Sequence, residues 1–297
     1  MTVVLPSPKP HAVRLHVLLA RQRRVGVVLR RGPSKAVQLV RWDLSRDTFE
    51  PGQWLRGRVY EHRCDLSPRG DLLAYFAAKN KGPYPAYTAI SRPPYFTALA
   101  LWPTLGTYGG GGLFASDSCF ELNHRGSQSA LAEGFSLPKR LRVSPLADHA
   151  GLGEDDPILH YRRLRDGWRL AEGGEVVKES FDAPIWIVYD PPQVYAKARP
   201  RTPHLELEHR LRGIKQKNGP WYVVDHAVVN RTDGSETLFE GCGWADWDSN
   251  GDLLFARDGQ LFRAPVVRSV LQAPKALIDL GEQTFRRVIA PPEARRW

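Results

Sequence analysis

The sequence has no run of about 18 consecutive apolar residues, the minimum for a membrane-spanning helix. We therefore expect no membrane association. The N-terminus has no basic start, and prolines and charges interrupt its apolar run, so it does not resemble a signal peptide. Cysteine is also scarce: the chain has Cys64, Cys119 and Cys242 and no Cys-x-x-Cys pair. An odd number of thiols is typical of a reducing compartment, and we predict a cytoplasmic protein with free thiols.

Complete catalytic motifs are missing as well. The glycine run at residues 109–112 is not followed by Gly-Lys-Ser/Thr or by a helical pattern, which excludes a P-loop. No Gly-x-Ser-x-Gly occurs, so the nucleophile elbow of a serine hydrolase is absent. Nothing near Cys119 or Cys242 resembles a protease signature, and a buried structural thiol is the simpler interpretation of each. We expect no cofactor.

Helical periodicity is rare in this chain. Its 24 prolines and 26 glycines punctuate nearly every segment. Between them lie runs of about four to eight residues rich in Val, Leu, Ile, Phe, Tyr and Trp, which are typical of β-strands. The apolar content of 42% is enough for a packed core. The pattern predicts an all-β fold with little helix.

Four pairs of these runs flank short turn sequences, and we expect them to form β-hairpins. Three of the turns contain Asp-Gly, in which Gly accepts a positive φ and Asp bonds to its own backbone. The expected hairpins join 25–30 to 36–44, the two runs around Asp166-Gly167, 221–230 to 235–240, and the two runs around Asp258-Gly259.

One turn sequence occurs twice. Gly-Asp-Leu-Leu follows Asp65 at residues 70–73 and follows Asp246 at residues 251–254, so the copies lie 181 positions apart (246 − 65). A degenerate third copy begins at Glu154, and its Arg-Asp-Gly recurs 92 positions later (257 − 165). A period of about 40–45 residues with about four strands is typical of a β-propeller. At this period the chain accommodates about six blades, with five as the alternative, in one domain over residues 13–297 after a tail of residues 1–12.

The segments "DLSPRGDLLAYF" and "DWDSNGDLLFARDGQLFRAPV" resemble the blade motif of WD-repeat-like and Tol-system-type propellers. In those blades a strand leads into a Ser-Pro-Asp-Gly turn, which residues 67–70 match well and residues 248–251 match loosely. Stacked blades cover the sheet faces that one blade leaves exposed, and circular closure removes free edges. The resemblance concerns the fold and carries over no catalytic residue, because propellers host enzymes, scaffolds and sensors.

The glycine run marks the first candidate binding loop. Consecutive glycines allow the backbone to approach a ligand, although a tight turn before the next strand is the alternative. The candidate residues of this loop are Tyr108, Gly109, Gly110, Gly111, Gly112, Ser116 and Asp117.

Tryptophan is abundant, with nine residues, several of them beside charged side chains. An exposed Trp beside Arg is typical of a binding hot spot, whereas a propeller often wedges Trp between its blades. The candidate contacts are Trp54, Arg56, Trp168, Trp244 and Trp247.

Two patterns resemble metal sites. Asp246, Asp248 and Asn250 alternate before a glycine, as at the start of a calcium loop, but Arg257 occupies the position of the final carboxylate. An Asp- and Asn-rich turn is the alternative. His204, Glu206 and Glu208 alternate on an expected strand and share one face, either as metal ligands or as a polar outer face.

The net charge of +10 is concentrated near the N-terminus. Residues 1–64 contain 13 Lys and Arg against four acidic residues, an excess of nine. Such asymmetry is typical of nucleic-acid binding, while general arginine preference is the alternative. Because no catalytic motif is complete, we expect a non-enzymatic protein-interaction or scaffold subunit of a multiprotein assembly. The alternatives are a hydrolase or lyase that uses the central propeller pocket, and nucleic-acid binding through the basic N-terminal region.

Overall fold

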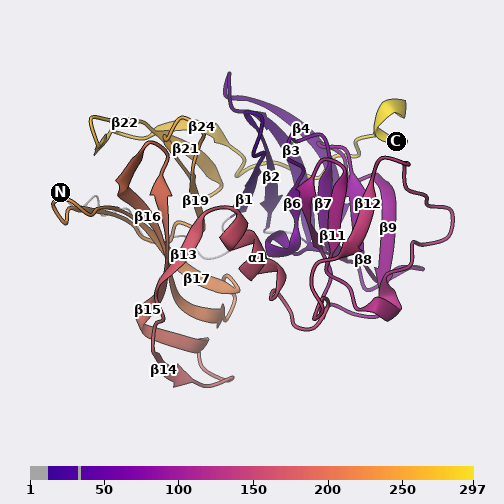
Figure 1. The fold of residues 1–297 in the computed structure, drawn as a ribbon, viewed down its shortest axis with the longest axis horizontal. Coiled ribbons are helices and arrows are strands. Elements are labelled where there is room, and N and C mark those ends of the chain that lie inside the picture. Colours follow the sequence, from indigo (N-terminus) through magenta and orange to yellow (C-terminus); the bar gives the residue numbers. More distant parts are fainter. Residues whose placement is uncertain (1–12, 33–34) are drawn as a thin grey trace. The chain divides into compact units, whose positions relative to one another are not determined.

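The computed structural model describes residues 13–32 and 35–297, and β-strands dominate them (Figure 1). These residues form two compact units. The first unit comprises His16–Arg162 and Thr284–Trp297, and the second comprises residues 13–15 and Arg163–Gln283. The expected all-β class is confirmed. The expected tail of residues 1–12 lies outside the described residues, and the single domain over 13–297 stays a prediction.

Three sheets follow one another between residues 14 and 145. The first has four antiparallel strands in chain order: β1 (Arg14–Leu19), β2 (Val25–Arg31), β3 (Ala36–Asp43) and β4 (Thr48–Arg56). The second contains β5 (Arg58–Val59), β6 (Asp65–Leu66), β7 (Leu73–Ala78), β8 (Ala86–Ser91) and β9 (Ala98–Thr104), with both β5 and β6 paired to β7. The third contains β10 (Gly112–Ser116), β11 (Cys119–Leu122) and β12 (Arg142–Pro145), and β12 runs parallel to β11.

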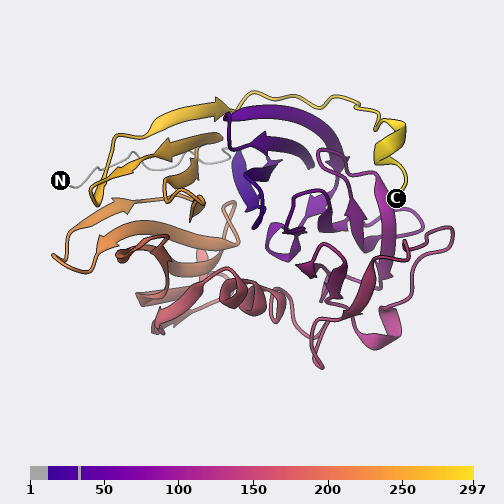
Figure 2. The same ribbon diagram turned by 45° about the horizontal axis from the view of Figure 1, so that its top comes forward.

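The second sheet is buried on both faces. Every residue of β7 is buried, and successive side chains of a strand point to opposite faces. Tyr75 belongs to a core shared with Leu39 of the first sheet. Ala74 belongs to a core shared with Phe114 of the third sheet. The three sheets of this unit are therefore stacked face to face, as the indigo, violet and magenta strands of Figure 2 show.

The second unit contains two larger sheets. The fourth sheet is formed by β13 (Trp168–Glu172), β14 (Val176–Glu179), β15 (Ile185–Arg199), β16 (Thr202–Gln216), β17 (Tyr222–Asn230) and β18 (Glu236–Phe239). The fifth is formed by β19 (Trp244–Trp247), β20 (Leu253–Arg257), β21 (Gln260–Ala264) and β24 (Lys275–Asp279). A short hairpin of β22 (Val266–Val267) and β23 (Val270–Leu271) adjoins them. A shared core that includes Leu207, Phe239 and Phe255 joins the two large sheets.

Helices are few, and one of them corrects a sequence prediction. The segment before Asp166-Gly167 was expected to be a strand, but it forms the helix α1 (Ile158–Arg165). Its residues are mostly Leu and Arg, which favour a helix, and Pro157 precedes it at a position that suits the first turn. The remaining helices are the single 3-10 turns η1 (Glu61–Arg63), η2 (Gly126–Gln128) and η3 (Pro292–Ala294). Within the described ranges, no helix has the length and apolarity needed to cross a membrane.

The other three expected hairpins are confirmed as β2–β3, β17–β18 and β20–β21. The two copies of the repeated turn also fold alike. Gly70 and Gly251 have φ angles of 77° and 84°, and each donates its N–H to the carbonyl oxygen three residues earlier, on Ser67 and Asp248. A residue with a Cβ is strained at such angles, so both turns depend on glycine.

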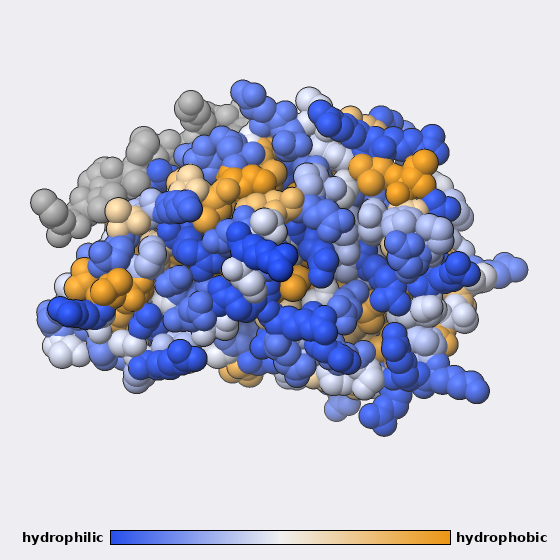
Figure 3. Space-filling view, turned by 90° about the horizontal axis from the view of Figure 1, so that it is seen from above, coloured by the Kyte–Doolittle hydropathy of each residue, from blue (hydrophilic) through white to orange (hydrophobic). Residues whose placement is uncertain are grey.

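Hydrophilic side chains cover most of the face drawn in Figure 3, where apolar side chains form small separate groups. This distribution is ordinary for a protein surface exposed to water.

Candidate functional site

The most unusual surface of the second unit is an extension of the fourth sheet. It consists of residues 173–193, which include β14 and the first part of β15, and of residues 212–223, which include the end of β16 and the start of β17. We call it the β14 arm. No residue from 173 to 193 is buried. In Figure 1 the strand β14 lies at the end of this extension.

The arm is rich in apolar side chains. Val176, Val177 and Phe181 are 54%, 58% and 66% exposed. The consecutive residues 185–189, Ile-Trp-Ile-Val-Tyr, are all partly exposed. Because neighbouring residues of a strand point to opposite faces, this run presents apolar groups on both faces of the sheet. A strand of this composition is normally buried on both sides.

The arm also has a free edge. Among the described strands, β14 pairs with β15 alone, and so does β13. Leu170 of β13 is 55% exposed. A free edge offers unpaired backbone N–H and C=O groups to an incoming strand, and natural proteins usually protect such edges with charge or cover. Lys178 and Glu179 place charge on this edge, but the neighbouring valines, Val176 and Val177, stay exposed to solvent.

An aromatic cluster stands at the tip of the arm. The rings of Phe181 and Trp186 meet edge to face with centroids 5.4 Å apart. The Lys215 ammonium lies 3.2 Å from the centroid of Phe181 and 5.7 Å from that of Trp186. Aromatic rings held beside a cation are common anchors of protein interfaces. These contacts favour one orientation of the two rings in the free protein.

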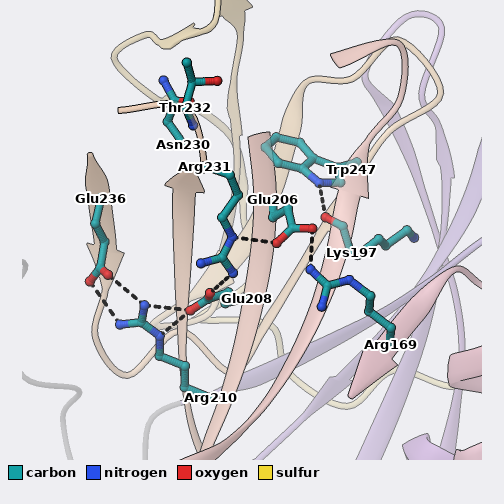
Figure 4. A network of polar contacts seen from close by, with 10 residues as sticks. All are labelled: Arg169, Lys197, Glu206, Glu208, Arg210, Asn230, Arg231, Thr232, Glu236 and Trp247. Atoms are coloured by element: carbon teal, nitrogen blue, oxygen red, sulfur yellow. Dashed lines mark hydrogen bonds and ion pairs between the residues drawn. The ribbon is translucent and has the colours of Figure 1, made fainter. Parts of the chain in front are cut away.

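A network of charges fixes the sheet from which the arm extends (Figure 4). Glu206 accepts hydrogen bonds from Arg169 at 2.6 Å and from Arg231 at 2.7 Å. Glu208 accepts from Arg231 at 2.5 Å and from Arg210 at 2.8 Å. The side chains of both glutamates are less than 10% exposed. Buried carboxylates need such partners, because a bare buried charge is very costly.

The same charges set the pKa values of this network. Burial acts to raise the pKa of Glu206, but hydrogen bonds from Arg169 and Arg231 outweigh it and lower that pKa. Burial acts to lower the pKa of Arg210, but Glu236 and Glu208 outweigh it and raise that pKa. Glu206 and Arg210 therefore both stay charged near neutral pH. The alternating row His204, Glu206 and Glu208 is thus engaged with arginines and with Ser269, which lies 3.0 Å from His204.

The glycine loop is packed into the first unit. Gly109, Gly110, Gly111 and Gly112 are all buried, and the first three have positive φ angles of 90°, 101° and 86°. Gly111 donates its N–H to Thr88 Oγ1 at 2.7 Å, and Thr88 contacts His124 Nε2 at 2.7 Å. These contacts favour the tight-turn alternative for the four glycines.

The remaining residues of that candidate loop are more exposed than the packed glycines. Tyr108 is 61% exposed, and Ser116 and Asp117 lie at the β10–β11 turn. Asp117 accepts hydrogen bonds from the backbone N–H and the Nε of Arg69, both at 3.0 Å.

Sequence analysis missed the residue that clamps this loop. Arg63 is 1% exposed and donates to the carbonyl oxygens of Thr107 and Gly109 at 2.7 and 2.6 Å, and to Asp155 at 2.7 Å. Its guanidinium also lies over the rings of Tyr60 and Phe76. These partners are scattered along the chain, so no local pattern identifies them.

The candidate aromatic contacts divide into two groups. Trp244 and Trp247 are 8% and 4% exposed, and Trp247 donates its indole N–H to the Lys197 carbonyl at 3.1 Å. Their burial favours the interpretation that they pack between sheets.

Trp54, Arg56 and Trp168 are more accessible. The ring centroids of Trp54 and Phe285 lie 5.9 Å apart, and the Arg56 guanidinium lies 4.4 Å from the Phe285 centroid, so both residues hold the C-terminal segment of the first unit. Trp168 is half-buried, and the Lys197 ammonium lies 5.7 Å from its ring.

The calcium-loop residues are bound to protein groups. Asp248 Oδ1 accepts the N–H groups of Asn250 and Asp252, and its Oδ2 accepts from Arg263. Asp246 accepts from the Lys197 ammonium at 2.6 Å. In the part of the chain that the structure describes, no three His, Cys, Asp or Glu residues are grouped as metal ligands. This geometry favours the turn alternative.

The three cysteines differ in burial and therefore in the reactivity of their thiols. Burial raises the pKa of Cys64 and of Cys242 to about 12, so neither is a ready nucleophile, whereas Cys119 is partly exposed.

Many arginines of the basic region have structural partners. Arg21 donates to the Phe114 carbonyl, Arg30 to the Gly32 carbonyl and Arg31 to Glu61. The excess of positive charge in this region therefore stabilises the fold at several points, which weakens the nucleic-acid interpretation.

One ionisable cluster of the first unit brings two histidines near a carboxylate that is paired with an arginine. The rings of His16 and His62 meet edge to face at 5.1 Å, and Glu61 binds Arg31 at 2.6 Å. Burial, followed by the charges of His62 and Arg162, holds the pKa of His16 well below 6.5. A neutral imidazole can accept a proton, which is the property that a general base needs.

No protein-family model matches this chain, and a search of the curated proteins finds no match.

Proposed function

We propose that this protein is a non-enzymatic interaction module, a subunit of a multiprotein assembly, that holds a protein partner on the β14 arm. The observation that carries the proposal is the exposure of apolar side chains on both faces and along the free edge of the arm. Apolar patches of this kind mark docking surfaces, and a free strand edge accepts a further strand from a partner.

The arm is also preorganised for binding. Phe181 is held by Trp186 and Lys215 at its tip, and the arginine–glutamate network fixes the sheet from which the arm extends. A partner therefore meets a surface whose rigid anchors are already ordered, which reduces the conformational entropy lost on binding. The partner would add a strand beside β14 and cover the exposed valines.

We further propose that the sheets form a β-propeller of the WD-repeat-like or Tol-system type. Among the described strands, five sheets of three or more strands follow one another along the chain. Shared cores join the first three sheets within one unit and the last two within the other. This order supports five blades instead of six.

The experiment is a comparison of copurified proteins from the native source. A triple variant Val176→Ser, Val177→Ser, Phe181→Ser removes the apolar surface of the arm. A matched control, Val267→Ser with Val270→Ser, changes valines that are 53% and 60% exposed on the separate β22–β23 hairpin. The wild type and the control are expected to retain one stoichiometric partner, and the arm variant is expected to lose it.

The partner identified by copurification is then purified, and its affinity for the wild type and for both variants is measured in a binding titration. A loss of affinity of about tenfold or more in the arm variant alone supports the proposal. Equal affinity in all three proteins, or no stoichiometric partner for the wild type, contradicts it.

A hydrolase or lyase is the second candidate, because the cluster of His16, Glu61 and His62 combines two imidazoles with a carboxylate. Turnover of an ester or phosphoester that is abolished by His62→Gln would favour this candidate. A full substrate panel without turnover would exclude it.

A further inference from the structure

A serine at the tip of the β22–β23 hairpin contacts a histidine of β16 within the second unit. Ser269 Oγ lies 3.0 Å from Nε2 of His204, although the two residues are 65 positions apart in the chain. When the imidazole carries its proton on Nδ1, its Nε2 accepts the hydrogen of the serine hydroxyl. A hydroxyl bound to a neutral imidazole is the arrangement in which a serine can act as a nucleophile.

The backbone that carries Ser269 has an unfavourable conformation for a residue with a side chain. Val267 pairs with Val270, so Arg268 and Ser269 form a two-residue turn. Their φ angles are 48° and 63°, in the left-handed region. Such turns are normally built from Asn and Gly, because most other residues are strained there. Strained residues are concentrated at functional sites, and here a hydroxyl stands at a position that suits glycine.

The sheet holds His204, and a carboxylate lies near it. His204 is half-buried in β16, and its carbonyl oxygen accepts the backbone N–H of Arg231 at 2.8 Å. Hydrogen bonds from Ser235 hold the pKa of Asp233 below its usual value, and the nearby charge of His204 adds to this effect. Asp233 therefore lies within electrostatic reach of the imidazole. A carboxylate in that position stabilises the imidazolium that forms when the histidine takes a proton.

The turn is open to solvent. Ser269 and His204 are each partly exposed, and Arg268 beside the serine is exposed. A small electrophile in solution can therefore approach the turn. The guanidinium of Arg268 also adds positive charge to the turn, which favours the negative oxygen that develops when a nucleophile attacks a carbonyl group.

We propose that Ser269 is a nucleophilic serine, activated by His204, that accepts an acyl group from an activated ester. Nε2 of His204 takes the hydroxyl proton while Oγ forms a bond to the carbonyl carbon of the ester. The bond between that carbon and the leaving oxygen then breaks, and the leaving alcohol or phenol takes the proton from the imidazolium. The products are an O-acylserine and the free alcohol or phenol. The second unit thereby carries a site of covalent modification in addition to the binding surface of the arm.

Acylation of the full-length protein by p-nitrophenyl acetate tests this assignment. Release of nitrophenolate gives the rate of the reaction, and peptide mass spectrometry locates the acetyl group. The wild type is expected to gain an acetyl group on Ser269. The rate should be at least about tenfold higher than that at Ser249, an exposed serine of the same unit, because a positioned base accelerates the attack.

Variants identify the residues responsible. Ser269→Gly removes the hydroxyl and should abolish acetylation at this turn, and glycine adopts the left-handed φ without strain, so the hairpin is kept. His204→Gln keeps the hydroxyl and should lower the acetylation rate of Ser269 about tenfold or more, because the general base is lost. Ser249→Ala is the matched control and should react like the wild type. Thermal unfolding of each variant shows that it folds.

Three results would overturn the proposal. They are the absence of an acetyl group on Ser269, acetylation of Ser269 and Ser249 at equal rates, and an unchanged acetylation rate in His204→Gln.

Discussion

The ammonium group of Lys215 lies 3.2 Å from the centre of the Phe181 ring, although the two residues are separated by most of β15 and β16. One side of the ring is thereby held, while the side chain stays 66% exposed. A cation–π contact at an exposed site contributes about 0.5–1 kcal/mol, which orients a ring without forming a core. Phe181 is thus ordered and accessible at the same time.

Replacing Phe181 is expected to change stability very little. Phe181→Ser should lower the free energy of unfolding by no more than about 1 kcal/mol, because the ring buries little area. Phe239→Ala, in the core of the second unit, should cost about 3–5 kcal/mol. Urea unfolding followed by tryptophan fluorescence measures both. A similar loss for the two variants would show that the arm has a core of its own.

The arginine–glutamate network is expected to depend on its buried carboxylates. Glu208→Gln removes the negative charge that Arg210 and Arg231 share, although Glu236 and Glu206 remain as their partners, and should cost about 1–3 kcal/mol. Glu172→Gln, at an exposed position of β13, should cost less than about 0.5 kcal/mol. Equal unfolding midpoints for the two variants would be inconsistent with a structural role for the network.

Stability at acid pH should depend on Glu61. Burial acts to raise the pKa of Glu61, but the charges of Arg31, His62 and His16 outweigh it, and the pKa falls from 4.5 to about 2. Because the folded-state pKa is lowered, the stabilisation is complete above pH 4.5 and is lost as the pH falls toward 2. It amounts to at most about 3 kcal/mol.

The Glu61→Gln variant lacks this titration. Between pH 5 and pH 2.5 its urea midpoint should therefore fall less than that of the wild type. Parallel pH profiles for the two proteins would exclude the contribution of Glu61.

The packed glycine loop gives a matched pair of substitutions. A Cβ on Gly110 would collide with the ring of Phe76, and its φ of 101° is unfavourable for alanine. Gly110→Ala should therefore cost about 2–4 kcal/mol. Nothing lies within 4 Å of a Cβ on Gly106, so Gly106→Ala should be nearly neutral. Thermal unfolding separates the two, and a harmless Gly110→Ala would show that the loop is loose.

Local turn chemistry made much of the strand pattern predictable. Glycines at positive φ mark the turns at Gly70, Gly251 and Gly259, and the strands around them match the expected positions. The helix α1 was missed because it is only eight residues long and the following Asp-Gly turn is equally compatible with a hairpin. Short segments of this kind carry too little periodicity to separate helix from strand.

The candidate site was less accessible to sequence reasoning. The run Ile-Trp-Ile-Val-Tyr at 185–189 reads as a buried strand, and only the fold reveals that nothing described covers it. Its unbroken apolar character, bounded by Pro184 and Pro191, was the available signal. Arg63 and the arginine–glutamate network depend on contacts between residues far apart in sequence, such as Arg63 with Asp155 and Arg169 with Glu206. Local spacing cannot encode these pairs.

Amide hydrogen exchange of the full-length protein, free and bound to its copurified partner, tests the central claim most directly. If a partner strand adds beside β14, the amides of residues 175–182 should exchange markedly more slowly in the complex than in the free protein. If those amides exchange at the same rate in both states while another surface becomes protected, the β14 arm is not where the partner binds.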